Sequence, residues 1–189
     1  QAKLQDSISV KDFGATGDGT TDDTNAILAA IAAMPSSGSN LLFPQGTYIV
    51  NADNYNGLKF DGKTNFAVEG YGATIKVKNG APVVGGYEVM SFFNCSNGAI
   101  NGLTINGNRV NRTITGETSA HGLTICTSCS QITVNDVIVV NSPADGFLIN
   151  TFTPATASTY PTDITLVNCV ADNSYRNGLS VIASLRCTV

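Results

Sequence analysis

A stripe of apolar residues near the start of the chain follows the period of an α-helix. The residues that share this face are Ala26, Ile27, Ala30, Ile31 and Met34. Thr20 or Thr21 is placed to N-cap the helix, with Asp22 and Asp23 in a first turn where the helix dipole favours negative charge. Pro35 and the Ser-Ser-Gly run after it end the pattern. The sequence therefore predicts a short helix over about residues 22–34.

The rest of the chain carries short apolar and polar alternations that repeat. One series reads HGLTI, DGFLI and NGLSV, beginning at residues 121, 145 and 177. A second reads QITV, DITL and RCTV, beginning at residues 131, 163 and 186. Both series fit one repeating coil if the chain carries extra residues in two loops, at about 108–120 and 151–162. Such a repeat predicts a solenoid in which each coil packs on its neighbours.

Aligned coils place apolar residues above one another. Aligning residues 92–108 with 126–142 puts Cys95 over Cys129 and Leu103 over Val137, and the next coil adds Cys169 above Val137. Columns that stay apolar from coil to coil are the inward face of a solenoid. These columns therefore predict the core.

We expect one domain over residues 1–189, with an N-terminal cap over 1–40 and coils over 41–189. The last repeat is incomplete at Val189. An open solenoid end exposes strand edges and core residues. We therefore expect the chain to be the N-terminal part of a longer protein, or to be closed off by another chain.

A column of polar residues stands immediately before the repeated glycines. It holds His121, Asp145 and Asn177, and the alignment of the earlier coil, extended towards the N-terminus, adds Tyr87. Equivalent residues on neighbouring coils lie about 4.8 Å apart in parallel strands, so the column gathers distant side chains. Further polar and aromatic side chains are expected on the same side, next to Asn177 and on the two loops: Arg176, Arg109, Arg112, Glu117 and Tyr160.

These residue types suit a polysaccharide site, because aromatic rings stack on sugars while Asp and Arg bind hydroxyls and carboxylates. We interpret Asp145 and His121 as a candidate general acid/base pair, and Arg176 as the partner of a substrate carboxylate. The structural alternative is that Asp145 caps the turn after Pro143 and that Arg176 is a solvated charge. The candidate substrate-binding residues are Tyr87, Arg109, Glu117, Tyr160 and Asn177.

Composition narrows the functional classes. Charged residues make up 13% of the chain, against about 25% in a typical domain, and the net charge is −4. No basic cluster points to nucleic acid, and no apolar run approaches the roughly 18 residues of a membrane span. We therefore expect neither a nucleic-acid partner nor a membrane span.

We also expect no metal or cofactor. The aspartates at 18, 22 and 23 lack the regular alternation and the distant Glu of a calcium loop. The five cysteines resemble neither a zinc site nor a disulfide framework, since Cys126 and Cys129 form one CxxC pair and His121 is the single histidine. We interpret the cysteines as small apolar residues in strands.

Two stretches carry a resemblance to a known family. SVKDFGATGDGTTDDTNAILAAI, residues 9–31, resembles the N-terminal signature of the pectate-lyase-like β-helix superfamily, which includes phage tailspike depolymerases and alginate epimerase modules. LLFPQGTYIV, residues 41–50, is similar to the strand that follows in that family. The resemblance implies an all-β fold: a right-handed, single-stranded parallel β-helix with a short N-terminal capping α-helix.

The chain departs from the epimerase branch at one motif. The catalytic run of alginate epimerases is Gly-Phe-Asp-Pro-His, whereas residues 146–150 read Gly-Phe-Leu-Ile-Asn. The Asp and His are missing, and no Asp cluster like that of calcium-dependent pectate lyases is present. The resemblance then favours the tailspike and glycoside-hydrolase branches, whose acidic pair often lies on later coils.

Three functions follow as expectations. The first is a phage tailspike or tail-fibre depolymerase, trimeric, located in the virion tail and acting on host capsule or O-antigen by hydrolysis or β-elimination. The second is a secreted, extracellular bacterial or fungal enzyme acting on uronans. The third is a non-catalytic structural or adhesin module. In the first two, catalytic residues are expected in part beyond residue 189.

Overall fold

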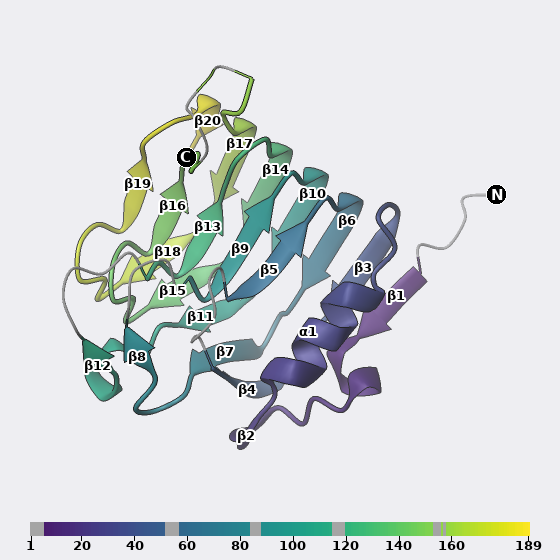
Figure 1. The fold of residues 1–189 in the computed structure, drawn as a ribbon, viewed down its shortest axis with the longest axis vertical. Coiled ribbons are helices and arrows are strands. Elements are labelled where there is room, and N and C mark those ends of the chain that lie inside the picture. Colours follow the sequence, from purple (N-terminus) through teal and green to yellow (C-terminus); the bar gives the residue numbers. More distant parts are fainter. Residues whose placement is uncertain (1–5, 52–56, 84–87, 115–119, 153–155, 157) are drawn as a thin grey trace.

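The chain coils into an all-β parallel solenoid with one short α-helix at its N-terminal end (Figure 1). The computed structural model describes residues 6–189 except 52–56, 84–87, 115–119, 153–155 and 157. Each complete coil contributes one strand to each of three parallel sheets, A, B and C. The fold predicted from the repeats is confirmed.

Sheet A has seven strands in parallel: β1 (Asp6–Ser9), β3 (Ser39–Leu42), β6 (Thr64–Glu69), β10 (Ser96–Asn101), β14 (Ser130–Asn135), β17 (Thr162–Val167) and β20 (Leu185–Thr188). Sheet B has six: β2 (Asp18–Asp22), β4 (Gly46–Val50), β7 (Ala73–Val77), β11 (Thr104–Asn106), β15 (Ile138–Val140) and β18 (Val170–Asp172). Each coil therefore runs from sheet A through sheet B to sheet C.

Sheet C has five strands: β5 (Leu58–Asp61), β9 (Met90–Phe93), β13 (Leu123–Ile125), β16 (Phe147–Ile149) and β19 (Leu179–Val181). A small extra pair, β8 (Pro82–Val83) and β12 (Thr113–Ile114), lies between sheets B and C. The pairing confirms the repeats that were aligned in the sequence. Leu123 of the first series pairs with Phe147, and Ile132 of the second series pairs with Ile164.

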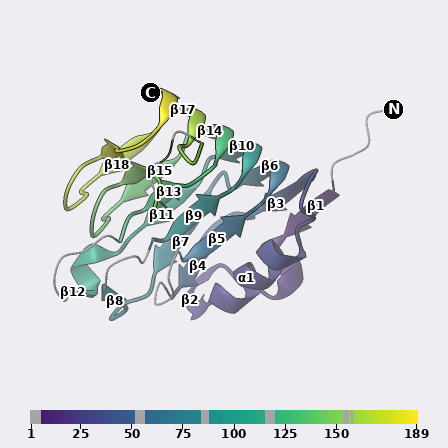
Figure 2. The same cartoon turned by 45° about the horizontal axis from the view of Figure 1, so that its top comes forward.

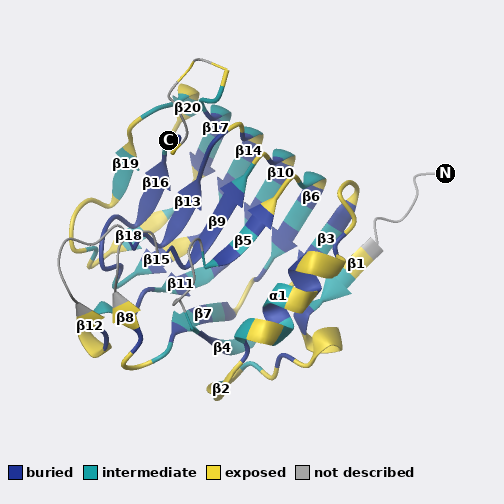
Figure 3. Cartoon of the chain, in the orientation of Figure 1, coloured by how far each residue is buried: buried dark blue, intermediate teal, exposed yellow. Residues whose placement is uncertain are grey.

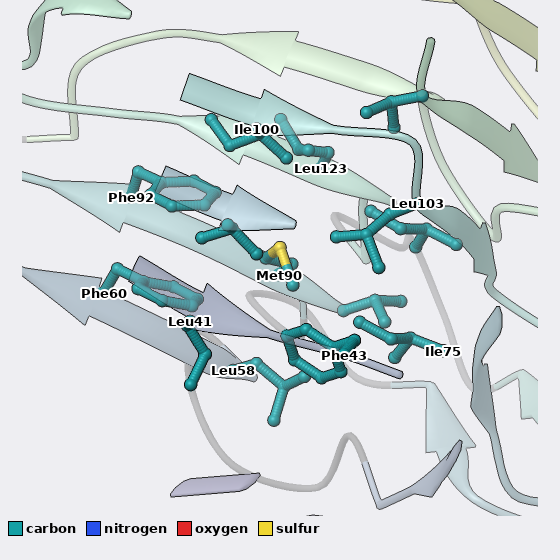
Figure 4. Close-up of a cluster of buried hydrophobic side chains, with 14 of the residues drawn as sticks. Leu41, Phe43, Leu58, Phe60, Ile75, Met90, Phe92, Ile100, Leu103 and Leu123 are labelled. Carbon is teal, nitrogen blue, oxygen red and sulfur yellow. The ribbon is translucent and has the colours of Figure 1, made fainter. Parts of the chain in front are cut away.

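The core is a stack of inward columns, coloured dark blue in Figure 3. Phe60 and Phe92 stack with ring centroids 4.7 Å apart, one coil above the other (Figure 4). The register pairs Ser96 with Ser130, which places Cys95 over Cys129 as predicted. Side chains in such columns bury apolar area on both neighbouring coils, so the coils stabilise one another.

Asn, Gly and Asp at the corners turn the chain from sheet to sheet. Gly102, Asp136 and Asn168 occupy equivalent places between sheets A and B, with φ of 71°, 53° and 52°. Short polar side chains and glycine tolerate this left-handed backbone far better than β-branched residues do. Asn, Asp and Gly therefore suit these corners.

The N-terminal end is covered by α1 (Thr24–Ala33), which packs against the 3-10 helix η1 (Val10–Phe13) and against β5 (Figure 2). A second 3-10 helix, η2 (Arg109–Asn111), lies in the predicted loop 108–120. The prediction that Thr20 or Thr21 N-caps the helix is wrong. Both hydroxyls donate to Asp18 within β2, and the Asp22 carboxylate instead accepts the Thr24 N–H.

Candidate functional site

A polar column lies at the corner between sheets B and C, just ahead of β9, β13, β16 and β19. The strand register assigns four residues to it: Glu88, His121, Asp145 and Asn177. Tyr87, which was predicted in this column from an offset of 34 residues, lies outside the described residues, and the register assigns Glu88 to that position. Met90 pairs with Leu123 in sheet C, an offset of 33, whereas Ser96 pairs with Ser130 in sheet A, an offset of 34.

His121 and Asp145 form a buried contact between adjacent coils. The His121 Nδ1 lies 3.3 Å from the Asp145 Oδ2, and the backbone N–H of Asp145 donates to the same nitrogen at 3.3 Å. The two side chains are 4% and 0% exposed. Burial lowers the pKa of His121 to about 4; Asp145 opposes the shift and Arg176 adds to it. At neutral pH the ring is therefore uncharged, and Nδ1 accepts rather than donates.

The second carboxylate oxygen of Asp145 accepts hydrogen bonds from the next coil. Its Oδ1 accepts the backbone N–H of Asn177 at 3.0 Å and the Asn177 side-chain amide at 3.2 Å. The Arg176 Nε lies 3.6 Å from the same oxygen. The carboxylate is thus fully buried and ties three consecutive coils together, which agrees with the structural alternative more closely than with an outward-facing acid.

An exposed surface adjoins this buried pair through Arg176. Tyr175 is 65% exposed and the Arg109 guanidinium lies 5.6 Å from the centre of its ring. Arg109 also donates to the Asn173 Oδ1 at 2.9 Å, and the Arg176 side chain is 45% exposed. We call Arg109, Tyr175 and Arg176 together the Arg109–Tyr175–Arg176 surface. It presents an aromatic ring with two guanidinium groups nearby.

Other predicted residues lie elsewhere. The Arg112 guanidinium is buried and donates to the carbonyls of Ala81, Gly107 and Pro82, and burial lowers its pKa to about 10. Tyr160 lies beyond the opposite end of sheet C, between β16 and β17, and so away from the polar column. The prediction that both loops share one side is therefore wrong. Tyr87 and Glu117 lie outside the described residues.

Two residues of the site were missed in the sequence. Glu88 is 1% exposed. It was missed because equivalent residues of these two coils are 34 positions apart in sheet A but 33 positions apart in sheet C. Tyr175 follows the corner residue Asn173 by two positions, and its equivalent one coil earlier is Pro143, so the repeat carried no signal for an aromatic ring. The signal that was available is the neighbouring arginine, Arg176.

The outer face of the three middle strands of sheet C is buried. Ser91, Thr124 and Leu148 point outward from consecutive strands, yet they are 0%, 0% and 1% exposed. In the sequence resemblance to the epimerase motif, Leu148 and Asn150 correspond to the Asp and the His. An aliphatic group and an amide cannot transfer a proton as those two side chains do.

The part of the chain that the structure describes holds neither a metal cluster nor a membrane helix. No three His, Cys, Asp or Glu side chains in it are grouped to hold an ion. No helix in it is long and apolar enough to cross a membrane.

Comparisons with known proteins agree on fold and family. A model of the family described as rhamnogalacturonase A/epimerase, pectate lyase-like, matches residues 7–184. Mannuronan C5-epimerase AlgE1 of Azotobacter vinelandii is 28% identical over 210 residues, which cover 94% of this chain and 14% of that protein. The chain spans 36% of mannuronan C5-epimerase AlgE4 from the same bacterium.

Solved structures show the same solenoid. The A-module of AlgE4 superposes with a TM-score of 0.57 at 27% identity, covering 94% of this chain and 54% of that one. The pre-mature gene product 12 of bacteriophage phi29 superposes with a TM-score of 0.76 at 23% identity, covering 95% of this chain and 24% of that one. At that identity the likeness to the phage protein concerns the fold alone.

Proposed function

The chain belongs to the pectate-lyase-like family of rhamnogalacturonase A and epimerases, a family of polysaccharide-acting β-helices, and from that premise we propose that it binds an acidic polysaccharide. The proposed binding site is the Arg109–Tyr175–Arg176 surface. The observation that carries the proposal is the strongly exposed Tyr175 ring, which lies against Arg109 and is followed in the chain by Arg176, itself in contact with the buried Asp145.

The chemistry of this surface matches an anionic sugar chain. An exposed aromatic ring offers an apolar face to the C–H groups of a sugar, and a nearby guanidinium binds a carboxylate through parallel N–H groups. Arg109 already contacts the Tyr175 ring, so less side-chain freedom is lost on binding than with a free ring. Asn177 is exposed, and since its amide N–H groups already donate to Asp145 and Ser180, it offers its amide oxygen to hydroxyl groups.

In this proposal the buried pair supports the surface. Asp145 holds Arg176 and Asn177 at one oxygen, which fixes the coil that carries Tyr175. Asp145 and His121 act as the acid/base pair only if substrate reaches two side chains that are 4% exposed or less. Cleavage of the bound chain, by hydrolysis or β-elimination, is the second and separable part of the proposal.

For the biological setting we propose a phage tailspike or tail-fibre depolymerase, trimeric, that recognises host capsule or O-antigen. All five cysteines, which all lie among the described residues, are free thiols. Free thiols suit synthesis in a reducing cytosol, where phage structural proteins are made. The 28% identity to mannuronan epimerases supports the other setting, an extracellular enzyme on uronans.

The test is a panel of capsular, O-antigen and uronan polysaccharides, measured for binding and for new reducing or unsaturated ends. We expect acidic members to bind and neutral members of similar size to bind at least tenfold more weakly. Binding with turnover supports a depolymerase, and binding without turnover supports a non-catalytic module. If no acidic polysaccharide binds, the proposed function is wrong.

A further inference from the structure

Two buried thiols stand one above the other at the corner between sheets C and A. Cys95 directly precedes β10 and Cys129 directly precedes β14, whose first residues Ser96 and Ser130 are paired. Neighbouring parallel strands lie about 4.8 Å apart, so the two Cα atoms are separated by roughly one rung. The two residues are 0% and 1% exposed.

The two side chains point into the same part of the core. Each thiol is the largest influence on the pKa of the other: Cys129 lowers the pKa of Cys95, and Cys95 raises the pKa of Cys129. Both Sγ atoms donate to consecutive carbonyls of β9: Cys95 to Phe93 at 3.1 Å, and Cys129 to Phe92 at 3.4 Å. The two sulfurs therefore lie against adjacent residues of β9, on coils that stack directly on one another.

The CxxC pair that the sequence displays is separated by the fold. Cys126 is buried but lies outside the core cluster that holds Cys95 and Cys129. Burial, and then the charge of Glu88, raise its pKa, and Lys59 opposes that shift. Lys59 lies between two inward residues of β5 and therefore points outward. Because Lys59 acts on the Cys126 thiol, we place Cys126 on the same outer face of sheet C. Cys129 thus faces Cys95 on the neighbouring coil rather than Cys126 of its own motif.

We propose that Cys95 and Cys129 are an oxidative modification site that forms a disulfide between adjacent coils. The rung spacing falls inside the roughly 4.4–6.8 Å that disulfides span between Cα atoms. A peroxide is a sufficient oxidant. The Cys95 thiolate attacks one peroxide oxygen and becomes a sulfenic acid, releasing one water; the Cys129 thiolate then attacks that sulfur and releases the second water.

The step balances as two thiols and one hydrogen peroxide giving one disulfide and two waters. Because both thiols are buried, the peroxide reaches them during local opening of the corner, so the reaction is slower than at a surface thiol. The new bond closes the whole coil between Cys95 and Cys129 into a loop. It restricts the unfolded chain and therefore raises the thermal midpoint.

The experiment treats the reduced, folded full chain with hydrogen peroxide, alkylates the remaining thiols under denaturing conditions and maps the peptides by mass spectrometry. We expect one crosslink, Cys95 to Cys129, and a Tm higher by roughly 5 °C or more that returns to the original value on reduction. Cys126→Ser is the matched control and is expected to keep both the crosslink and the Tm rise.

Cys95→Ser and Cys129→Ser are each expected to lose the crosslink. The peptide map of the oxidised wild-type chain shows by itself whether Cys95 and Cys129 are crosslinked, even if a variant folds poorly. A crosslink that joins Cys126 to either residue overturns the proposal. So does recovery of Cys95 and Cys129 as free thiols or as sulfinic acids once the less buried thiols of Cys169 and Cys187 have been fully oxidised.

Discussion

At the scale of the residue, the contact between His121 and Asp145 links protonation to folding. The folded-state pKa of His121 is lowered to about 4 from an unfolded value of 6.5. Between these two values the unfolded chain binds a proton that the folded chain does not. Stability therefore rises with pH across this window and is lost as pH falls from 6.5 towards 4.

The first prediction is this acid sensitivity. Replacing His121 by Gln removes the titrating group, so the variant should lose less stability than the wild type between pH 6.5 and 4. The difference amounts to at most about 3 kcal/mol for a shift of this size. Urea unfolding at a series of pH values measures it. Parallel pH profiles for the two proteins would show that His121 is not the group responsible.

A second prediction separates the charge of Asp145 from its hydrogen bonds. Asp145→Asn keeps an oxygen for the Asn177 N–H and should cost about 1 kcal/mol or less, whereas Asp145→Ala leaves buried donors unpaired and should cost about 3 kcal/mol. Urea unfolding of the two variants measures both losses. In Asp145→Asn the pKa of His121 should fall further, because the carboxylate opposes the present shift. Equal losses in both variants would contradict the assigned role.

At the scale of the element, the last five strands of sheet A share a left-handed second residue. These residues are Asn65, Asn97, Gln131, Asp163 and Arg186, with φ between 50° and 58°. Asn97 also donates its amide to the Asn65 Oδ1 at 2.5 Å. The column bends each strand at the same place, so the coils remain in register.

This column gives the third prediction. Asn97→Ala should cost about 1–2 kcal/mol, since alanine loses the amide ladder and strains the left-handed backbone. Asn97→Gly loses the ladder alone and should be less costly than Asn97→Ala. Thr133→Ala, on the neighbouring strand and without a left-handed backbone, is the control in the same thermal or urea unfolding series. An Asn97→Gly variant less stable than Asn97→Ala would contradict the conformational argument.

The elements were largely predictable and the corners were not. The apolar stripe that includes Ile27 and Ile31 predicted α1 to within two positions at its start, and the repeated triplets predicted the strands of sheet C. Gln131 and Arg186 carry no local preference for left-handed backbone. Their conformation follows from stacking on Asn97 and Asp163, which is a tertiary constraint.

At the scale of the whole molecule, the unequal lengths of the coils limited which site residues could be identified by aligning the repeats. The column at His121 and Asp145 was found because their two coils align without a gap. Glu88 was missed because the preceding coil has different lengths before sheets A and C. Tyr160 was misplaced because the order of loops along the chain does not say at which end of sheet C each one lies.

Two exposed tyrosines of the molecule have different surroundings. Tyr175 lies beside two arginines at the corner between sheets B and C, whereas Tyr71 is 61% exposed at the corner between sheets A and B and donates its hydroxyl to Asp136. The first environment suits an anionic sugar and the second repels one. The pair therefore forms a matched comparison within one chain.

The central claim is tested most directly by titrating the best acidic oligosaccharide from the panel into the wild type, Tyr175→Ala and Tyr71→Ala by calorimetry. Loss of the Tyr175 ring should weaken binding at least tenfold, about 1.4 kcal/mol, with the fold intact because the ring is exposed. Tyr71→Ala should bind as the wild type does. Equal affinities for the wild type and Tyr175→Ala would contradict the claim that the Arg109–Tyr175–Arg176 surface is the binding site.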